Sequence, residues 1–377
     1  MKHKPKVSII VPVFHAKAYI DRCLESIVGQ TYENIEILLM VKSGDVSLPQ
    51  CIEWQKRDWR ITIVCRNDSS LGDARNYAMS VAEGEYIGYI DADDWEENDF
   101  IEKMVTPLIS NGKAEISCCG FDWNDNNGKT EHEWLPRFQG LVENGLWSSW
   151  VTVWIRLYRK SFLVDNDIDF FDGSHEDDAY YWLVKAYAKF GYFLPEVLYH
   201  YTEDNQDSLM HIKSQRIMYF GAMSYTMDKL LQSNVATPFY GFMLKELLRN
   251  IPYKLFDLGE ERDKGEKAAG DFLRKYFCIA PIILFGSGND ANDFLIRHYD
   301  AKVKYIVDNN KNKIGKKLQG IEIKPYEQLN DETGLVVIAS TKYSKEIEKQ
   351  LLTDGYTFYL EMNDYDWVLC EYLKYCK

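Results

Sequence analysis

Residues 7–39 read VSIIVPVFHAKAYIDRCLESIVGQTYENIEILL, and this stretch decides the fold of the first third of the chain. It opens on a run of β-branched residues, which favours a buried strand. Apolar residues then recur at helical spacing over 16–29, and a second apolar strand covers 35–41. The alternation continues through a strand, a helix and a strand at 61–65, 73–82 and 86–90. Strands that alternate with helices predict an α/β fold with a mostly parallel sheet covered on both faces.

The pattern changes twice along the rest of the chain. It loosens from about residue 111, although 177–190 has helical periodicity, and residues 210–277 are helical throughout. From residue 280 strands and helices alternate again. We therefore expect three parts: an α/β domain over 1–210, a helical connector over 211–277 and a small α/β domain over 278–377.

Composition narrows the class of protein. The chain has 377 residues and a formal net charge of −14, which argues against nucleic acid as a partner. It has no run of about 18 apolar residues, so we expect no membrane-spanning helix. The eight cysteines lack metal-ligand spacing, and the N-terminal apolar run is short and reads as a strand rather than a signal peptide. A cytoplasmic protein with free thiols is the expectation.

Residues 86–95, YIGYIDADDW, place Asp91, Asp93 and Asp94 at the end of an apolar strand. Crowded carboxylates repel each other and resist burial. A divalent cation reverses that balance, because Mg²⁺ and Mn²⁺ prefer hard oxygen ligands. Where a parallel strand opens into a crevice, such a cluster can hold a metal–diphosphate. The alternative is a helix N-terminus, where carboxylates complement the helix dipole.

Several segments together resemble the family 2 glycosyltransferases, the inverting group with the GT-A nucleotide-diphospho-sugar transferase fold. The opening stretch is followed by ARN (74–76) and EGEYIGYIDADDW, which are similar to the family's A-R-N and D-x-D-D segments. The resemblance continues through VWIRLYRKSF (153–162), HEDDAYYW (175–182) and LYHYTEDNQDSL (198–209). It covers residues 5–210, and the motifs occur in the family's order and spacing.

The resemblance implies a donor side built from three of these motifs. Asp91 of the D-x-D lies near the ribose and the metal, and Asp93 is the direct ligand of Mn²⁺ or Mg²⁺. Arg75 faces the diphosphate, where a guanidinium fork suits oxyanions, with a helix-surface ion pair as the alternative. The end of the first strand supplies one wall of the nucleobase pocket: Pro12, Val13 and Phe14.

The same resemblance places the catalytic base in HEDDAYYW. Inversion needs a group that takes the proton from the attacking hydroxyl. Asp177 is the residue implied by position, with Glu176 and Asp178 as alternatives if the register differs by one. The structural alternative is an acidic first turn of a helix. His200 is a further candidate for the cation's shell, although such histidines more often serve in packing.

One part of the family pattern is missing. After the second strand the family carries V-D-D-G-S-x-D, whose aspartate recognises the nucleobase, whereas residues 40–45 read MVKSGD. Val41 and Lys42 stand where the two aspartates are expected, so Asp45 or a backbone group is left to contact the base. A UDP-sugar is the donor that the family implies, and this departure concerns the part of the pattern that recognises its nucleobase.

The acceptor side has no motif of its own. Trp147, Trp150 and Trp154 are candidates for it, because the C–H face of a sugar packs on aromatic rings, but at this spacing they can equally be core residues of a helix. The family implies a glycan acceptor on a lipid or protein carrier at the cytoplasmic face of a bacterial membrane. Segment 210–277 has a local excess of positive charge, which suits peripheral contact with anionic lipid. The alternative is a helical connector between the two α/β domains. Homo-oligomer formation stays open.

The C-terminal part carries a second motif. IILFGSGNDANDFL (282–295) contains Gly286-x-Gly288-x-x-Ala291 between a strand and a helix, and Asp308 ends the next strand. This is the context of a dinucleotide fingerprint, with phosphate at the helix N-terminus and the acid on ribose. It also resembles the small Rossmann-like domain that accompanies sugar-modifying enzymes. A non-catalytic module for assembly, ligand sensing or docking is the preferred interpretation, and nucleotide binding is the alternative.

These motifs predict a metal-dependent inverting glycosyltransferase. It would move a sugar from a nucleotide-diphosphate donor, a UDP-sugar, to a hydroxyl of a glycan, as in the synthesis of bacterial surface polysaccharides or glycoconjugates. Two alternatives remain: an NAD-dependent sugar-modifying enzyme that works from the C-terminal part, and a nucleotide-binding relative without catalysis.

Overall fold

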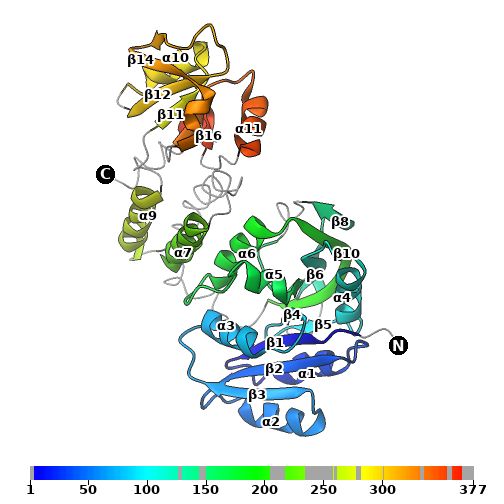
Figure 1. The fold of residues 1–377 in the computed structure, drawn as a ribbon. Helices are drawn as coiled ribbons and strands as arrows, with labels where there is room; N and C mark the ends of the chain where they lie inside the picture. Colours follow the sequence, from blue (N-terminus) through cyan, green and yellow to red (C-terminus); the bar gives the residue numbers. More distant parts are fainter. Residues whose placement is uncertain are drawn as a thin grey trace. The chain divides into compact units, whose positions relative to one another are not determined.

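The computed structural model divides the chain into two compact units, Met1–Ala222 and Met223–Lys377 (Figure 1). The described residues are 4–125, 130–143, 150–203, 217–233, 258, 261–276, 282–299, 301–331, 335–354 and 359–366. The predicted connector 211–277 is represented by two helices, α7 (Met218–Gln232) and α9 (Arg262–Tyr276), and most of its other residues lie outside the described set. The division into three parts at 210 and 277 therefore stays a prediction.

The N-terminal unit is built on a ten-stranded sheet. Its path is β3-β2-β1-β4-β9-β6-β10-β5, with β7 paired to β6 and β8 to β10. The first four strands are parallel, so the predicted α/β fold with a largely parallel sheet is confirmed. The elements are β1 (Val7–Val13), α1 (Ile20–Val28), β2 (Ile35–Lys42), α2 (Leu48–Arg57), β3 (Ile61–Arg66), α3 (Leu71–Val81), β4 (Tyr86–Tyr89), β5 (Trp95–Glu96), α4 (Phe100–Ser110), β6 (Ile116–Asn124), β7 (Thr130–Trp134), β8 (Gly140–Glu143), β9 (Arg156–Arg159), α5 (Lys160–Asp165), α6 (Glu176–Tyr187) and β10 (Phe190–Thr202).

The centre of this sheet is covered on both faces. All seven residues of β1 are buried, as expected for a central parallel strand. Helix α1 turns a stripe of apolar side chains toward the sheet, including Ile20, Leu24 and Ile27. Because crossovers between parallel strands are right-handed, α1 and α2 cover one face and α3 the other (Figure 1). This arrangement brings the loops after β1, β2 and β4 to the same edge of the sheet.

Helix α3 is docked against the segment that precedes α6. A Cβ atom added at Gly72 would lie 2.1 Å from the carbonyl oxygen of Phe171, so only glycine fits there. The amide of Asn76, from the A-R-N segment, donates to the carbonyl of Phe170 and accepts from its N–H, both at 2.8 Å. These contacts fix the helix from which the side chain of Arg75 projects.

The C-terminal unit holds a second, six-stranded sheet. Its order is β13-β14-β12-β11-β15-β16; the strands from β14 to β16 are parallel and β13 is antiparallel to β14. The predicted second, small α/β domain is thereby confirmed. Its elements are β11 (Ile282–Phe285), α10 (Asn289–Arg297), β12 (Val303–Asp308), β13 (Lys317–Leu318), β14 (Ile321–Pro325), η5 (Tyr326–Asp331), β15 (Leu335–Ile338), α11 (Ser344–Thr353) and β16 (Tyr359–Glu361).

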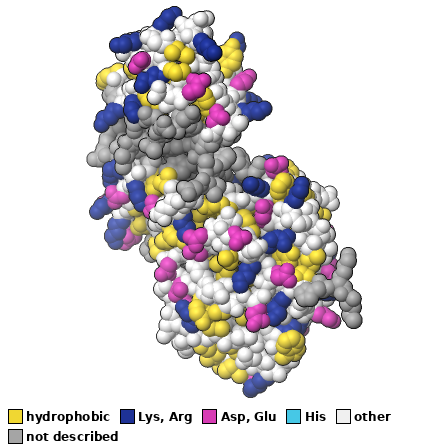
Figure 2. Space-filling model, in the orientation of Figure 1, with side chains coloured by type: hydrophobic (Ala, Val, Ile, Leu, Met, Phe, Trp, Pro, Cys, Tyr) yellow, Lys and Arg dark blue, Asp and Glu magenta, His cyan; other side chains and the backbone are white. Residues whose placement is uncertain are grey.

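The structure differs in two places from what the sequence pattern predicts. The helix predicted over 177–190 ends at Tyr187, and Phe190 already begins β10. The loosened segment after residue 111 contains four strands, β6 to β9, of which β7 and β8 lie at the sheet's margin and β9 is short. Among the described residues, no helix is both long and apolar enough to cross a membrane. On the face drawn in Figure 2, basic and acidic side chains are interspersed.

Candidate active site

The loops after β1 and β2 are tied together by Asp45. Its carboxylate accepts the N–H groups of His15 and Ser47, both at 2.8 Å. Burial alone would raise the pKa of Asp45, but these backbone donors outweigh it and the net shift is downward. Asp45 therefore shapes the loop that the sequence assigns to the nucleobase, with both oxygens engaged by backbone. Its predicted contact with the base is untested.

Phe14 offers the exposed part of the predicted nucleobase wall. Pro12 and Val13 are buried inside β1, whereas Phe14 is exposed. The ammonium of Lys42 lies 4.7 Å from the centre of the Phe14 ring. Lys42 replaces an aspartate of the family pattern, so the structure puts a cation and an aromatic face where the family has a carboxylate.

Asp94 has a structural role that the sequence did not reveal. It is completely buried, and its two oxygens accept the N–H of Thr202 at 2.8 Å and the hydroxyl of Tyr199 at 2.6 Å. Burial, Asp93 and Asp91 raise its pKa well above the ordinary range. The helix that follows begins only at Phe100, so the helix-start interpretation of Asp94 is wrong. Asp94 therefore fastens residues 91–94, which we call the acidic loop, to β10.

The same strand fixes the main chain of Asp93. The carbonyl oxygen of Asp93 accepts the hydroxyl of Thr202 at 2.6 Å and a guanidinium N–H of Arg22 at 3.0 Å. The Arg22 guanidinium also stacks over Trp95 at 3.8 Å. The half-buried side chain of Asp93 is thus carried on a rigid loop, which suits a metal ligand.

Arg75 joins the donor motif to the base motif. Its side chain is 1% exposed, and its guanidinium donates to Asp91 at 2.7 Å and to Glu176 and Asp177 at 2.8 Å each. We call these four residues the Arg75 cluster. The guanidinium is engaged by carboxylates rather than open to a diphosphate, which the sequence did not foresee. Asp91 and Asp177 remain 28% and 26% exposed, so the cluster is covered on one side and open on the other.

Charge is not balanced in the Arg75 cluster. One guanidinium cannot neutralise three carboxylates, so a proton is retained. Burial raises the pKa of Glu176 to about 8, with Asp177 adding to the rise and Arg75 opposing it. Burial also raises the pKa of Asp91, again against the pull of Arg75. Burial would lower the pKa of Arg75, but Asp177, Asp91 and Glu176 together raise it, so the arginine stays charged.

The first turn of α6 separates the three acids of HEDDAYYW. Glu176 is buried and Asp177 reaches Arg75, whereas Asp178 pairs with Nδ1 of His175 at 2.8 Å. His175 has a φ of +67°, in the left-handed region that non-glycine residues seldom adopt. The turn is therefore held by a strained residue, a feature of functional sites. The helix dipole stabilises negative charge at this end.

The ring of His200 contacts acids outside the acidic loop. Its ring contacts Asp122 at 2.7 Å through Nδ1 and Glu97 at 3.2 Å through Nε2, and it stacks on Trp95. Burial lowers the pKa of His200, but the two acids raise it more, and the net shift is upward. The positions that the structure shows give His200 a packing and ion-pair role, and its place in a metal shell stays an untested prediction.

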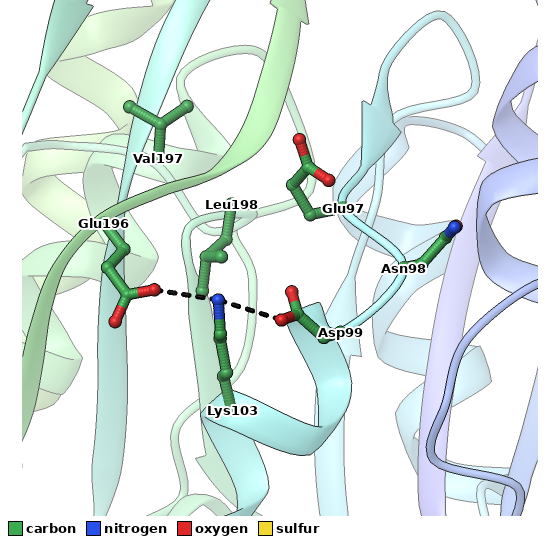
Figure 3. Close-up of a pocket in the computed structure, with 7 residues that line it drawn as sticks. All are labelled: Glu97, Asn98, Asp99, Lys103, Glu196, Val197 and Leu198. Carbon is green, nitrogen blue, oxygen red and sulfur yellow. Dashed lines mark hydrogen bonds and ion pairs between the residues drawn. The ribbon is translucent and has the colours of Figure 1, made fainter.

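Two surface pockets lie away from the Arg75 cluster. One of about 390 Å³ is lined by acids and Lys103, whose ammonium points between Glu196 at 2.8 Å and Asp99 at 2.9 Å (Figure 3). The other, of about 540 Å³, lies against α1 and α2 and includes Asp21 and Trp54. Neither is lined by Asp91, Asp93 or Asp177, so pocket size does not locate the site that the motifs predict.

The C-terminal motif forms a loop that is closed by its own acid. Gly286 has a φ of +107°, which requires glycine, and a Cβ at Gly288 would meet nothing within 4 Å. Asp308 accepts the N–H of Ser287 at 2.9 Å and also bonds its hydroxyl, while its other oxygen accepts the N–H of Asn310. The carboxylate predicted for ribose is thus engaged by the loop. Nucleotide binding at Gly286, Gly288 and Asp308 stays a prediction.

The unfolding free energy is expected to fall between about pH 5 and pH 8 because of Glu176. The folded chain keeps a proton up to its pKa of about 8, whereas an unfolded glutamate releases it near about 4.3. The native state then binds more protons in this window, so each pH unit costs up to about 1.4 kcal/mol. Urea denaturation at several pH values should show a flatter slope for Glu176→Gln than for the wild type. Equal slopes would contradict the raised pKa of Glu176.

Known proteins match both units. Residues 8–165 match the family described as "Glycosyl transferase family 2", and residues 279–359 match one described as "C2185-like, N-terminal". EpsH of Bacillus subtilis is 30% identical over 215 residues, 52% of this chain and 60% of EpsH. Glycosyltransferase GlyA of Streptococcus pneumoniae is 27% identical over 60% of this chain and 36% of GlyA. This chain thus spans less than two thirds of either relative.

A solved structure shows the same fold. S. aureus TarS in complex with UDP-GlcNAc superposes with a TM-score of 0.62 at 20% identity, covering 72% of this chain and 81% of the TarS chain. At this identity the likeness concerns the fold. The N-terminal unit thus has the fold of TarS, and the segment that carries β1 to β9 matches the model of glycosyltransferase family 2.

Proposed function

We propose that the chain is a metal-dependent inverting glycosyltransferase with a UDP-sugar as donor and a glycan hydroxyl as acceptor. The observation that carries the proposal is the Arg75 cluster, in which Asp91 and Asp177 share one guanidinium although their motifs are distant in sequence. A donor-side acid and a candidate base thus meet at the open side of one buried cation. Such a pair is what transfer with inversion requires on the two sides of a sugar.

The donor lies along the loops at the carboxyl edge of the sheet. Phe14 offers an aromatic face to the nucleobase, and Asp45 ties the loop after β2 to His15, the residue that follows Phe14. Asp91 bonds the ribose side of the nucleotide. Ligands of open α/β sheets bind at this edge, outside the carboxyl ends of the strands.

The acidic loop fits a divalent cation shared with the donor. Among the described residues no three His, Cys, Asp or Glu side chains form a closed metal site. Mg²⁺ is often held by one or two carboxylates with the remaining ligands from water and substrate phosphates, a set that Asp93 and Asp91 can begin. When bound, Mn²⁺ or Mg²⁺ neutralises the charge that develops on the departing diphosphate.

Asp177 is the group best placed to act as base. Glu176 is buried and holds its proton up to about pH 8, so it accepts none at neutral pH, and Asp178 is paired with His175. Asp177 is partly exposed beside Arg75. In the proposed step the acceptor oxygen bonds the anomeric carbon, the bond to the diphosphate breaks, and the hydroxyl proton passes to Asp177.

The proposed cellular setting rests on the family resemblance rather than on the site. A glycan on a lipid or protein carrier is the proposed acceptor, in bacterial polysaccharide or glycoconjugate synthesis at the inner face of the plasma membrane. The segment proposed to touch lipid, 210–277, lies largely outside the described residues. The assembly state of the chain belongs to the same set of open proposals.

Donor hydrolysis tests the proposal directly. With Mn²⁺ present, a panel of nucleotide sugars should include one that the chain hydrolyses slowly, and EDTA should abolish that hydrolysis. Asp93→Ala should lower the rate by about 100-fold or more, because it removes the predicted metal ligand. Asp99→Ala is the matched control, since this acid lies in the same segment but pairs with Lys103.

Two outcomes would overturn the proposal. One is the absence of metal-dependent hydrolysis for every nucleotide sugar in the panel. The other is an Asp93→Ala variant as active as the Asp99→Ala control, which would separate the acidic loop from the chemistry.

A further inference from the structure

The N-terminal unit carries an aromatic surface beyond the Arg75 cluster. Trp123, His132, Trp134 and Trp150 form it, and we call them the aromatic platform. Trp123 stacks on His132 at 4.2 Å, and Trp150 lies 5.6 Å from Trp123 and 6.2 Å from Trp134 between ring centres. Trp150 is 43% exposed, His132 is exposed, and the other two are half-buried. Four aromatic rings thus gather at one surface, where Trp123, Trp134 and Trp150 also pack on the buried Phe121.

Strand register explains why these rings share one face. Trp123 of β6 pairs with His132 of β7, and Phe121 pairs with Trp134. On the other side of β6, Phe121 pairs with Tyr199 of β10 and Trp123 with Tyr201, the strand that fastens the acidic loop. Since side chains alternate along a strand, these paired residues all project from the same face. The sheet therefore carries an aromatic row across three strands.

That row leads from the platform to the acidic loop. Phe121 lies 5.8 Å from Trp150 and 4.8 Å from Trp154, which stacks on Tyr199 at 4.4 Å with an interplanar angle of 15°. The hydroxyl of Tyr199 donates to Asp94 and accepts the N–H of Asp91 at 3.3 Å. Trp154 is buried, so it is a core residue, but it lies in a turn before β9 and not in the helix that the structural alternative assumed. The platform is thus linked to the acidic loop through rings that are themselves buried.

The chemistry of the platform favours sugar rings over lipid. A pyranose has an apolar face of C–H groups that packs on an aromatic ring while its hydroxyls stay in water. A lipid chain would instead need a contiguous aliphatic patch; of the described residues adjacent to the platform in the chain, Leu135 and Val151 are the exposed aliphatic ones.

We infer that the aromatic platform binds sugar rings of the acceptor, which is therefore a chain of several sugars rather than a monosaccharide or a bare lipid. This inference rests on the proposed function. The sugar that is extended would lie at the Arg75 cluster, and units further along the chain would stack on Trp150 and its neighbours.

Saturation-transfer difference NMR with maltohexaose, cellohexaose and chitohexaose tests the inference. Since every pyranose has a C–H face, we expect the wild type to bind at least one of them weakly. Trp150→Ala and Trp134→Ala should each weaken that binding by about tenfold, the effect of losing one well-packed aromatic contact. Trp59→Ala is the matched control, because Trp59 is 89% exposed beyond α2 and outside the platform. Trp150→Phe keeps a ring and should retain part of the binding.

The outcomes separate this inference from the proposed function. Hexaose binding that both alanine variants share with the wild type would overturn it, and so would a wild type that binds no hexaose. If an alanine variant loses its thermal unfolding transition, the comparison of Trp150→Phe with Trp59→Ala decides: equal affinities of these two overturn the inference. Metal-dependent donor hydrolysis by the wild type is measured in parallel. Hydrolysis without hexaose binding leaves the proposed function standing, and hexaose binding without hydrolysis leaves the platform standing.

Discussion

Replacing Arg75 with methionine is expected to destabilise the N-terminal unit by about 3–5 kcal/mol, the cost of leaving buried charge without its partner. The guanidinium is 1% exposed and bonds Asp91, Glu176 and Asp177. Methionine fills a similar volume but leaves Asp91 and Asp177 facing each other beside the protonated Glu176, with no cation between them. Protonation of the acids would relieve part of the repulsion, so the loss should be smaller in mild acid than at neutral pH.

Tryptophan fluorescence during urea denaturation measures this loss of stability in the N-terminal unit. Every tryptophan except Trp367 lies between residues 1 and 222. Arg66→Met is the matched control: Arg66 pairs with Asp68 at 2.6 Å but is a third exposed, so its loss should destabilise the unit far less. Arg75→Lys should fall between the two, because an ammonium keeps the charge but lacks the fork. Equal unfolding free energies for Arg75→Met and Arg66→Met would contradict the importance of the cluster.

The parallel half of the fold was predictable because its signals are local. Apolar runs and helical periodicity place β1 to β4 within a few residues of their observed bounds, and the order of the family's motifs supplies the rest. The antiparallel strands were not predictable. β9 (Arg156–Arg159) is four residues long with an arginine at each end, so no alternation is visible in it. Its place in the sheet is set by pairing with β4 and β6, a non-local cause.

The same limit applies to the site. The resemblance named Asp91, Arg75 and Asp177, but it described Arg75 as a diphosphate ligand. That Arg75 lies under the carboxylates depends on Asn76 docking α3 onto Phe170, a contact between residues 94 positions apart. Asp94 is a second case, because its partners come from β10 and no pattern near residue 94 announces them. Tertiary contacts of this kind decide which acid is structural and which faces substrate.

Asp177→Asn is expected to lower the rate of sugar transfer by about 10²–10⁴-fold while donor binding persists. The amide keeps the shape of the side chain and an oxygen for Arg75 but cannot take a proton. The loss should therefore appear in kcat for transfer, with little change in the KM of the donor, because the group acts only as the hydroxyl is deprotonated. Product formation with the identified donor and acceptor measures it, and titration with UDP and Mn²⁺ checks that the donor still binds.

The neighbouring acids make this prediction discriminating. Asp172→Asn removes a charge shortly before α6 from a residue that bonds Ser69 and Ser70, so it should transfer sugar at the wild-type rate. Asp178→Asn breaks the pair with His175 and should cost less than Asp177→Asn, since it disturbs only the turn that presents the base. If Asp178→Asn abolished transfer and Asp177→Asn did not, the base would be Asp178. The contact of Asp177 with Arg75 would then be structural, like that of Glu176, and the donor acid and the base would no longer meet at one guanidinium.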